Sequence, residues 1–564
     1  MRPESRAMDG PQADTLGISP ILARILSLRG LTSTEDIRRF LCPNLSLLKP
    51  LEEWPGLLEG ARSLAMALEE RGALVVWGDY DVDGVTATAL VRDFCARRGV
   101  VAKHFLPCRD DGYGLSVHGI ENLAEAGAKV LLTVDCGTNA LEPIARAKEL
   151  GLFVAVTDHH APGPELPPAD VLINPLVLDW PSKSLAGVGV VFFLAAALNR
   201  LLPGPVVDMR QFLDLVALGT VADVVSLKGQ NRILVKNGQL LLKDSPRPGI
   251  RALKRVCGME TDASVGTGSI GFGLAPRLNA AGRLDDPEMA LDLILSEDEA
   301  AAGRMARKLD VLNSNRRAEE ARILDEARVQ AMGQTALGRA GFVLYGPDWH
   351  QGVIGIVASR IVEEFHVPTI VLTANHEGLK GSGRSAGDFD LFQGLTRCSE
   401  LLTRFGGHRH AAGCSLPPER LEAFEGLFSE VVLEQLGRRP GPSEIVLDMA
   451  LPFQDITPVL LDEIELMQPF GPGNPRPVFR SGWLEVRDSR LLGRDRLHLG
   501  LTLRDPECGT TMQAQFWRAG PEWTATDLKG HELQVAFCPQ KSNYEGLMRI
   551  QLTIKAVLGV RAGD

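Results

Sequence analysis

Three aspartates at alternate positions are the first residues in this sequence that could perform chemistry. Asp79, Asp81 and Asp83 follow an apolar run over residues 73–77, and a helix-like pattern covers residues 85–97. The apolar run is typical of a buried parallel strand. Carboxylates so close together repel one another unless cations neutralise them. The sequence therefore predicts a divalent metal site after this strand.

Two other interpretations of the aspartates compete with a divalent metal site. The segment 79–84 matches the opening of an EF-hand calcium loop, but Leu90 stands where that loop requires a bidentate Glu. A strand, rather than a helix, also precedes the segment. A solvated acidic turn is the usual explanation for one or two aspartates after a strand. The Leu90 position and the preceding strand argue against the EF-hand, and reactive residues elsewhere in the chain argue against the acidic turn.

Further reactive residues follow further predicted strands. Strands are expected over residues 100–106, 130–134, 153–157 and 171–173, and they alternate with helical segments. This alternation predicts a doubly wound parallel sheet, in which the carboxyl ends of the strands meet at one edge. The residues expected at that edge are Asp79, Asp81, Asp83, Asp135, Asp158, His159 and His160.

The residue types at this edge suggest the metal and the reaction. A helical apolar stretch over residues 212–222 ends at Asp223, which is either a further ligand or an ordinary helix-end residue. Mixed carboxylate and imidazole ligands favour manganese, and magnesium is tolerated by the oxygen ligands. Two ions about 4 Å apart activate a water and stabilise both oxygens of a phosphoryl displacement. The residues alone therefore indicate hydrolysis of a phosphate ester or anhydride.

Composition narrows the class of protein. The 564 residues are too many for one core, so three or four domains are expected, and 45% hydrophobic and 23% charged residues are ordinary for a soluble globular protein. The longest apolar run, residues 188–198, is too short to span a bilayer, and no signal-peptide pattern is seen, so a cytoplasmic enzyme is expected. Nine cysteines without a CxxC pair give no disulfide framework or zinc ribbon. A net charge of −11 still allows a local basic groove for nucleic acid.

The pattern of predicted elements divides the chain into five segments. We expect a helical N-terminal extension (1–50), a catalytic α/β domain (51–260), a helical connector (261–338), a second α/β domain (339–438) and a β-barrel (439–564). The last segment contains short runs of β-like alternation, which predict an OB-type barrel. Aromatic residues there are candidates for stacking on bases, although most aromatics at alternating strand positions belong to a core. These candidates are Trp483, Phe516, Trp517 and Tyr544.

Many short blocks, in order along the chain, carry a family resemblance. They are GDYDVDG (78–84), GYGL (112–115), TVDCGT (133–138), TDHH (157–160), LAGVGV (185–190), LDLVALGTVADVV (213–225), NRILV (231–235), PRLNAAGRL (276–284), WHQGVIGIVASR (349–360), GSGRS (381–385), FGGHRHAAG (405–413) and PFGPGNPRPVF (469–479). By these blocks the chain resembles the DHH phosphoesterase superfamily and, over nearly its whole length, the RecJ family of single-strand-specific 5′→3′ DNA exonucleases. The resemblance makes the second α/β domain a DHH-associated substrate-binding domain.

The resemblance implies a role for each residue of the metal site. Asp81 is expected to bind one metal ion and Asp83 the other, with Asp135 bridging both. His159 and Asp223 are expected to complete the coordination of the second ion.

The resemblance also implies roles around these ligands. Asp79 is expected to support the first ion, His160 to face the scissile phosphate, and Asp158 to stand behind the ligands and orient His159. Some relatives have a histidine ligand at the position of Trp77, so Asp79 or water is expected to replace it.

Further residues are expected near the substrate. Small glycines in GSGRS and FGGH let backbone N–H groups approach a phosphate, or they form ordinary turns. The residues expected to contact substrate phosphates or DNA are His160, Arg277, Asn279, Arg283, Arg384 and His408.

The implied function is single-stranded-DNA-specific 5′→3′ exonuclease activity that releases nucleoside 5′-monophosphates in DNA repair and recombination. A single-strand-binding protein and a helicase are expected partners, a monomer is the expected state, and no membrane is involved. Two alternatives remain: a DHH-type phosphodiesterase acting on short oligonucleotides or small nucleotides, and a catalytically dead scaffold that binds strands.

Overall fold

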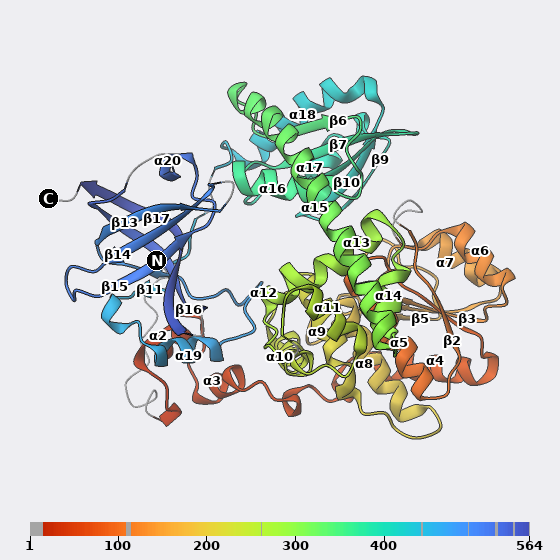
Figure 1. Ribbon diagram of the computed structural model, residues 1–564. Coiled ribbons are helices and arrows are strands. Elements are labelled where there is room, and N and C mark those ends of the chain that lie inside the picture. The colour runs from red at the N-terminus through yellow and green to blue at the C-terminus, as the bar shows by residue number, and fades with distance from the viewer. Residues whose placement is uncertain are drawn as a thin grey trace. The chain divides into compact units, whose positions relative to one another are not determined.

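The structure is a computed structural model that describes residues 15–108, 114–260, 262–441, 444–493, 496–524, 528–544 and 547–562. The chain forms two compact units (Figure 1). The larger unit comprises residues 49–225 and 237–444, and the smaller unit comprises residues 1–48, 226–236 and 445–564. No helix among the described residues is long and apolar enough to cross a membrane.

The first sheet of the larger unit is parallel throughout, which confirms the predicted doubly wound class. Its strand order is β2-β1-β3-β4-β5. The strands are β1 (Leu74–Trp77), β2 (Ala102–Phe105), β3 (Val130–Val134), β4 (Phe153–Thr157) and β5 (Val171–Ile173). β1 and β3 are buried along their whole length because helices cover both faces of the sheet.

Alternate side chains of these strands enter two different cores. α6 (Val117–Glu125) and α7 (Leu141–Glu149) pack on the face that carries Val75 and Leu131. α4 (Leu57–Arg71), α5 (Val82–Arg97) and α8 (Gly187–Leu201) pack on the face that carries Leu74 and Leu132. α9 (Leu213–Ala222) packs against α5 and α8.

Helices occupy the chain after this sheet. They are α10 (Gly229–Lys243), α11 (Pro248–Val256), α12 (Thr267–Ser269), a π-helical turn (Ile270–Leu274), α13 (Ala275–Leu284), α14 (Glu288–Leu295) and α15 (Glu299–Ala336). α15 is 38 residues long and packs against α11, α13 and α16 (Ile354–Phe365). The long helix therefore contacts both α/β parts of the larger unit.

The second sheet of the larger unit is mixed. Its order is β6-β7-β8-β10-β9, with β6 and β7 parallel and the other neighbours antiparallel. The strands are β6 (Phe342–Gly346), β7 (Thr369–Asn375), β8 (Gly378–Arg384), β9 (Arg404–Gly407) and β10 (Ala411–Leu416), and the remaining helices are α17 (Leu391–Arg397) and α18 (Leu421–Leu436).

The glycines of GSGRS serve a different purpose from the turn or phosphate cradle that we expected. Gly381 and Gly383 lie inside β8, on the face that turns toward the core. A Cβ on Gly381 would come 2.5 Å from a methyl of Leu372, and one on Gly383 would come 3.0 Å from Leu391. The glycines are thus required by close packing, which a sequence window cannot reveal.

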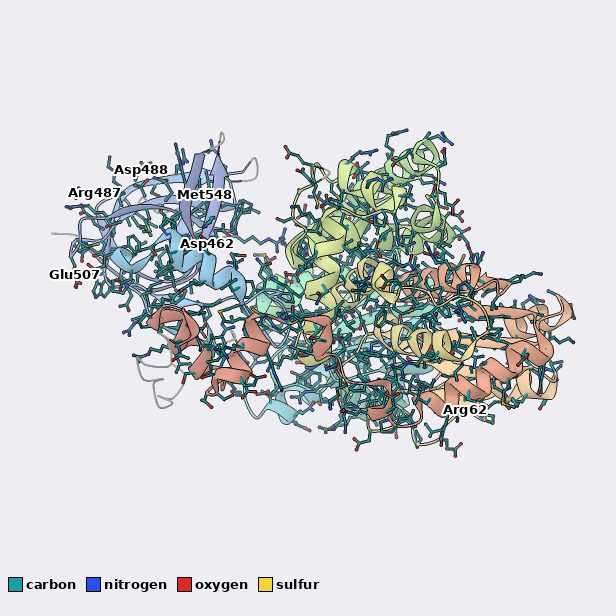
Figure 2. All side chains as sticks on the ribbon, turned by 90° about the horizontal axis from the view of Figure 1, so that it is seen from below. Arg62, Asp462, Arg487, Asp488, Glu507 and Met548 are labelled. Atoms are coloured by element: carbon teal, nitrogen blue, oxygen red, sulfur yellow. The ribbon has the colours of Figure 1, made fainter. Side chains whose placement is uncertain are left out.

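The smaller unit contains a closed barrel, which confirms the OB-type prediction. β16 pairs with both β13 and β17, so that β16, β13, β14, β15 and β17 close on themselves. The strands are β11 (Met449–Ala450), β12 (Phe479–Arg480), β13 (Leu484–Leu492), β14 (His498–Arg504), β15 (Thr511–Phe516), β16 (His531–Tyr544) and β17 (Leu547–Ala562). α19 (Pro458–Leu466) and α20 (Pro521–Thr524) accompany them. Arg487, Asp488 and Met548 project from the barrel surface (Figure 2).

The N-terminal helices pack into the barrel's core. α2 (Pro20–Leu28) and α3 (Thr34–Leu41) contribute Leu22, Ile25 and Ile37 to the same buried cluster as the strands. Arg29 forms an ion pair with Asp448 at 3.3 Å, and both side chains are nearly inaccessible to solvent. The segment that we predicted to be a helical N-terminal extension therefore packs with the barrel in one compact unit.

Candidate metal centre

The loop after β1 places its aspartates by capping a helix. Asp81 is the N-cap residue of α5, and its Oδ1 accepts hydrogen bonds from the N–H groups of Asp83 (2.9 Å) and Gly84 (3.1 Å). An N-cap carboxylate satisfies N–H groups that have no partner within the helix. This cap fixes the direction in which the first turn of α5 presents Asp83.

Asp83 is held by a second helix. Its Oδ2 accepts from the N–H of Gly187 at 2.6 Å, and its Oδ1 accepts from the N–H of Val188 at 2.9 Å. Both donors lie in the first turn of α8, where Ala186 offers no capping side chain. The sequence analysis missed this contact, although an apolar helix that begins without a capping residue is a signal that its N–H groups need an acceptor from elsewhere.

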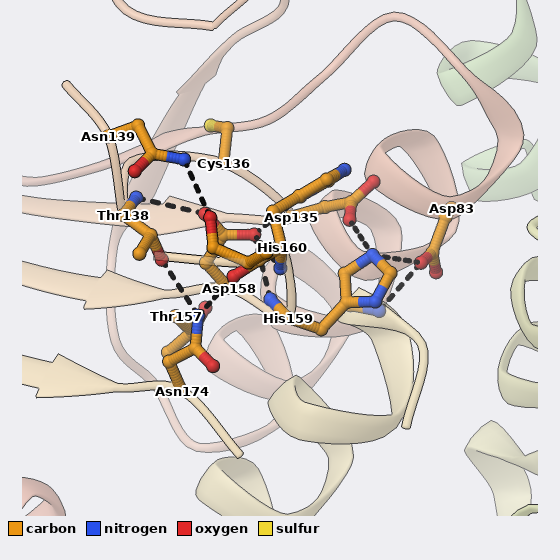
Figure 3. A network of polar contacts seen from close by, with 12 residues as sticks. Asp83, Asp135, Cys136, Thr138, Asn139, Thr157, Asp158, His159, His160 and Asn174 are labelled. Carbon is orange, nitrogen blue, oxygen red and sulfur yellow. Dashed lines mark hydrogen bonds and ion pairs between the residues drawn. The ribbon is translucent and has the colours of Figure 1, made fainter. Parts of the chain in front are cut away.

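His159 lies among three of the predicted carboxylates. Figure 3 shows two of them, Asp83 and Asp135, beside its ring. Its Nε2 is 3.1 Å from Asp135 Oδ1, 3.6 Å from Asp223 Oδ2 and 3.9 Å from Asp83 Oδ2. Asp223 reaches this point from the C-terminal end of α9. Strand ends and helix ends that are distant in sequence therefore bring these ligand types together.

The ligand atoms form groups that could each hold an ion. One group is Asp83, His159 and Asp223, and a second is Asp79, Asp81 and Asp135, with the ligand atoms of each group within 4.8 Å of one another. Asp135 also groups with His159 and His160. Among the described residues, all six predicted ligands thus belong to such groups.

The approach of these carboxylates depends on glycine. A Cβ on Gly187 would lie 2.5 Å from Asp135 Oδ1, and one on Gly219 would lie 2.7 Å from Asp83 Oδ1. Asp135 itself adopts a left-handed conformation with φ of 62°, which is uncommon for a residue with a side chain. Backbone strain of this kind is frequent where a functional group must be aimed.

The electrostatics of the cluster fit divalent cations. Burial, and then the charge of neighbouring aspartates, raises the pKa of Asp83 to about 7 and of Asp223 to about 9, and it also raises that of Asp135. Burial, followed by the charge of His160, lowers the pKa of His159 to about 4, so this imidazole is neutral.

Unsatisfied polar atoms support the same fit. The buried His159 Nε2 and Asp223 Oδ2 have no hydrogen-bond partner within the part of the chain that the structure describes. Buried polar atoms normally have partners. A neutral imidazole among repelling carboxylates is a donor set that Mn²⁺ accepts and that a cation would stabilise.

Asp158 contacts a different histidine from the one we expected. Its Oδ1 accepts from the ring Nδ1 of His160 at 2.7 Å, whereas it reaches His159 only through the backbone N–H, also at 2.7 Å. Its Oδ2 accepts from the N–H of Thr138 at 2.9 Å. Asp158 therefore holds His159 by its backbone and His160 by its ring, and its expected role in orienting His159 stays a prediction.

Asp158 and His160 form a charged pair. Burial opposes both charges, but the mutual hydrogen bond and attraction outweigh it, so the pKa of His160 rises to about 9 and that of Asp158 falls below its usual range. His160 is thus an imidazolium at neutral pH. A fixed positive charge beside the carboxylate cluster can bind a phosphate oxygen.

Trp77 is a core residue. Its ring packs 4.4 Å from that of Phe105, between centroids, and belongs to the apolar cluster that includes Ile120. Asp79, by contrast, is grouped with Asp81 and Asp135. The position at which some relatives have a histidine therefore contributes no ligand here, and Asp79 is the available replacement.

His408, in the turn between β9 and β10, lies close enough to His160 for their charges to interact. Burial lowers the pKa of His408, and the positive charges of His410, His160 and Arg384 lower it further. Arg384 Nη1 donates to Ser382 Oγ (3.1 Å) and to the carbonyl of Gly383 (2.8 Å). The predicted phosphate contacts His160, Arg384 and His408 are accordingly near enough to influence one another.

The predicted residues of α13 make contacts within the protein. Asn279 Oδ1 accepts from the N–H of Val82 at 3.2 Å, which attaches α13 to the metal loop. Arg277 binds Asp310 at 2.8 Å, and Arg283 donates to the carbonyl of Gly352 at 2.9 Å. Their contact with DNA stays a prediction. Gly112 and Tyr113 of the GYGL block, and the side chain of Tyr544, lie outside the described residues.

Family models match three parts of the chain. They are described as the DHH family, N-terminal domain (residues 73–220), the DHHA1 domain (338–434) and the RecJ OB domain (447–556). The single-stranded-DNA-specific exonuclease RecJ of Dickeya dadantii is 38% identical to this chain over 95% of both proteins. The chain belongs to the RecJ family.

Other relatives have different lengths and known structures. The RecJ of Bacillus subtilis is 34% identical over 87% of this chain, which spans only 62% of that relative's length. The crystal structure of RecJ in complex with Mn²⁺ from Thermus thermophilus superimposes with a TM-score of 0.83 at 30% identity, covering 98% of this chain and 78% of that one. The crystal structure of the same protein in complex with Mg²⁺ superimposes with a TM-score of 0.76. This RecJ-family chain thus shares its fold with proteins solved with either metal.

Proposed function

We propose that this RecJ-family chain is a single-stranded-DNA-specific 5′→3′ exonuclease that hydrolyses phosphodiesters and releases nucleoside 5′-monophosphates. The observation that carries the proposal is that the two ligand groups are adjacent. His159 Nε2 of one group lies 3.1 Å from Asp135 Oδ1 of the other. Such a pair of ligand groups could hold the two cations that a phosphoryl displacement of this kind uses. The 5′→3′ polarity rests on the family alone.

Each ligand has a proposed place. Asp79 and Asp81 would hold one ion, Asp83, His159 and Asp223 would hold the other, and Asp135 would serve both. When bound, two manganese or magnesium ions supply the Lewis acidity that activates a water and stabilises the attacking and leaving oxygens.

The remaining residues of the centre position the substrate. Asp158 fixes Nδ1 of the His160 imidazolium, which leaves the Nε2–H to donate to an oxygen of the scissile phosphate. Arg384 and His408 would bind the neighbouring phosphate. These groups hold the phosphodiester in line for displacement, and such positioning is a large part of phosphoryl-transfer catalysis.

The barrel would bind the rest of the strand. Trp517 is 50% exposed, and its ring meets that of His498 edge to face with 4.8 Å between centroids, so it is the best placed of the four candidates to stack on a base. Phe516 packs against the barrel core, and the guanidinium of Arg561 covers the ring of Trp483, so these two are poor stacking candidates.

Two alternatives have less support. A closed barrel with an exposed tryptophan serves no purpose for a small nucleotide substrate. A catalytically dead scaffold would have no need for a complete ligand set. We further propose a cytoplasmic monomer that acts in DNA repair and recombination with a single-strand-binding protein and a helicase; these points rest on the family alone.

Digestion of labelled oligonucleotides tests the proposal. Single strands labelled at the 5′ or 3′ end would be incubated with manganese and either the wild type or Asp135→Ala. We expect immediate release of labelled mononucleotide from the 5′ end, dependent on manganese and absent from the variant, with a blunt duplex left intact. Equal degradation of duplex and single strand, or retention of both labels by the wild type, would contradict the proposal.

A further inference from the structure

Phe272 is the most exposed large apolar side chain that the structure describes. Its ring is 87% exposed, although burying a phenylalanine is normally favourable by about 1.5–3 kcal/mol. No role in the metal centre or the core accounts for a phenyl ring held in water. An exposed aromatic ring on an ordered element is a feature of surfaces that bind flat ligands.

The backbone around Phe272 is rigidly anchored. It lies in the π-helical turn Ile270–Leu274, whose first and last residues, Ile270 and Leu274, are completely buried. A Cβ on the adjacent Gly271 would meet no atom within 4 Å. The turn therefore displays the ring on a fixed support with open space beside it. Single π-helical turns are often found at functional sites.

The same helix is attached to the metal loop. The π-helical turn continues without interruption into α13, where Asn279 Oδ1 accepts from the N–H of Val82. Gly282 of α13 packs so closely against the carbonyl of Tyr80 that a Cβ there would clash with it. α13 thus fixes the position of Phe272 relative to the aspartates that follow β1.

The helix also sets the distance between Phe272 and the residue that binds the metal loop, Asn279. Phe272 precedes Asn279 by seven residues, which is at most about 10 Å along the helix axis. Stacked nucleotides of one strand are about 3.4 Å apart. A ring in this place is roughly three nucleotides from the metal loop.

We propose that Phe272 is a base-stacking residue for the single strand that enters the metal centre. The inference rests on the proposed function and adds a binding subsite for an unpaired base, a few nucleotides from the scissile phosphate. Every base has a face that can stack, so the subsite is independent of sequence. Paired bases have both faces covered by their neighbours, so the ring also favours a single strand over a duplex.

A double-mutant cycle on protein and DNA tests the subsite. Affinity would be measured by fluorescence anisotropy, in EDTA to prevent cleavage, for oligonucleotides with one abasic position at each of the first six nucleotides from the 5′ end. In the wild type, we expect the loss of one particular base to weaken binding about 5- to 100-fold. Phe272→Ala should bind all the oligonucleotides weakly, and the abasic position that matters in the wild type should no longer weaken binding further. Phe272→Trp should restore the dependence of affinity on that base.

Kinetics and a control separate stacking from a structural role. Phe272→Ala should raise KM for long single strands with kcat unchanged, and its melting temperature should equal that of the wild type, because the ring packs against little. Leu337→Ala, which removes another apolar side chain that is 76% exposed, should change neither KM nor the melting temperature.

Three results would count against the proposal in distinguishable ways. A wild type that degrades single strands while Phe272→Ala binds equally well would overturn the inference alone. A lower melting temperature with unchanged DNA affinity would mean that the ring packs against another part of the chain. A wild type that neither binds nor cleaves single strands would overturn the proposed function as well.

Discussion

At the scale of single residues, the centre contains two histidines in opposite charge states. His159 is neutral because it is buried, whereas His160 is charged because Asp158 binds its ring. A neutral imidazole offers a lone pair to a cation, and an imidazolium offers a proton to a phosphate oxygen. Two adjacent histidines therefore differ in protonation state, and the Asp158 carboxylate makes the difference because it binds the ring of His160 only.

The substitution Asp158→Asn should change the charge of His160. Without the carboxylate, burial dominates and the pKa of His160 falls from about 9. We expect kcat/KM on single-stranded DNA at pH 8 to drop by about 10- to 100-fold, because the imidazolium is lost. The alkaline decline of the pH–rate profile should move to lower pH, as measured between pH 6 and 10.

The same pair makes a prediction about stability. The folded-state pKa of His160 lies above the ordinary value of 6.5, so its contribution is complete below pH 6.5 and is lost as the pH rises through about 9. The melting temperature of the wild type should therefore fall over this range more than that of Asp158→Asn. Glu149→Gln, which alters an exposed carboxylate, is the control and should behave as wild type. Equal pH dependence of all three proteins would contradict the prediction.

Residue types were predictable here, but their contacts were not. Asp83 could be chosen from the sequence because strand-end aspartates at alternate positions need a cation. Its donors in Gly187 and Val188 are about a hundred residues away in the chain, so no local pattern pairs them with it. The ring that Asp158 binds depends on the geometry of one turn, so the sequence could not show that it is the ring of His160.

At the scale of elements, the centre is built by helix ends that approach one another closely. The first turn of α8 meets both Asp83 and Asp135, and it can do so only because residue 187 lacks a side chain. The strands were predictable because apolar runs of this length, regularly interrupted by helices, have few other interpretations. The close approach of α8 to the two aspartates was not predictable, because a glycine in LAGVGV could equally well begin a turn.

The substitution Gly187→Ala should damage the metal centre while preserving the fold. The new Cβ would lie 2.5 Å from Asp135 Oδ1, so the carboxylate must move. We expect manganese affinity, measured by isothermal titration calorimetry, to fall at least about tenfold, which is the scale of effect for displaced ligand support. Gly189→Ala is the matched control in the same helix, since its Cβ would meet Leu185 at an ordinary 3.4 Å. If both variants bound manganese normally, the role of close approach would be refuted.

At the scale of the whole molecule, the carboxylate cluster links metal binding to stability. The folded-state pKa values of Asp83 (about 7) and Asp223 (about 9) lie above the ordinary value of 3.8. Their contribution to metal-free stability is complete below about pH 4 and is lost as the pH rises through these values. A cation reverses this loss because it neutralises the repulsion.

The increase in melting temperature on adding manganese should therefore grow between pH 6 and pH 9. Manganese at about a hundred times its dissociation constant should stabilise the protein by about 2.7 kcal/mol, or roughly 3 °C for a unit of this size, at the upper end. Thermal denaturation in EDTA and in manganese measures this difference. Asp223→Asn, which removes the charge of a carboxylate whose buried Oδ2 has no hydrogen-bond partner among the described residues, should melt higher than the wild type in EDTA at pH 9 and gain less from manganese. A gain that does not depend on pH would count against the charge repulsion.

The two-unit organisation predicts how the chain tolerates truncation. α2 buries Leu22, Ile25 and Leu26 in the barrel core, each worth roughly 2 kcal/mol, and Arg29 pairs with Asp448. Deleting residues 445–564 alone should expose this apolar face, giving aggregation in size-exclusion chromatography and strong binding of a hydrophobic dye. Deleting residues 1–48 as well should reduce both signals, because the unpartnered helices are removed with the barrel. If the single deletion stayed monomeric with no more dye binding than the double deletion, the N-terminal helices would not depend on the barrel for their packing.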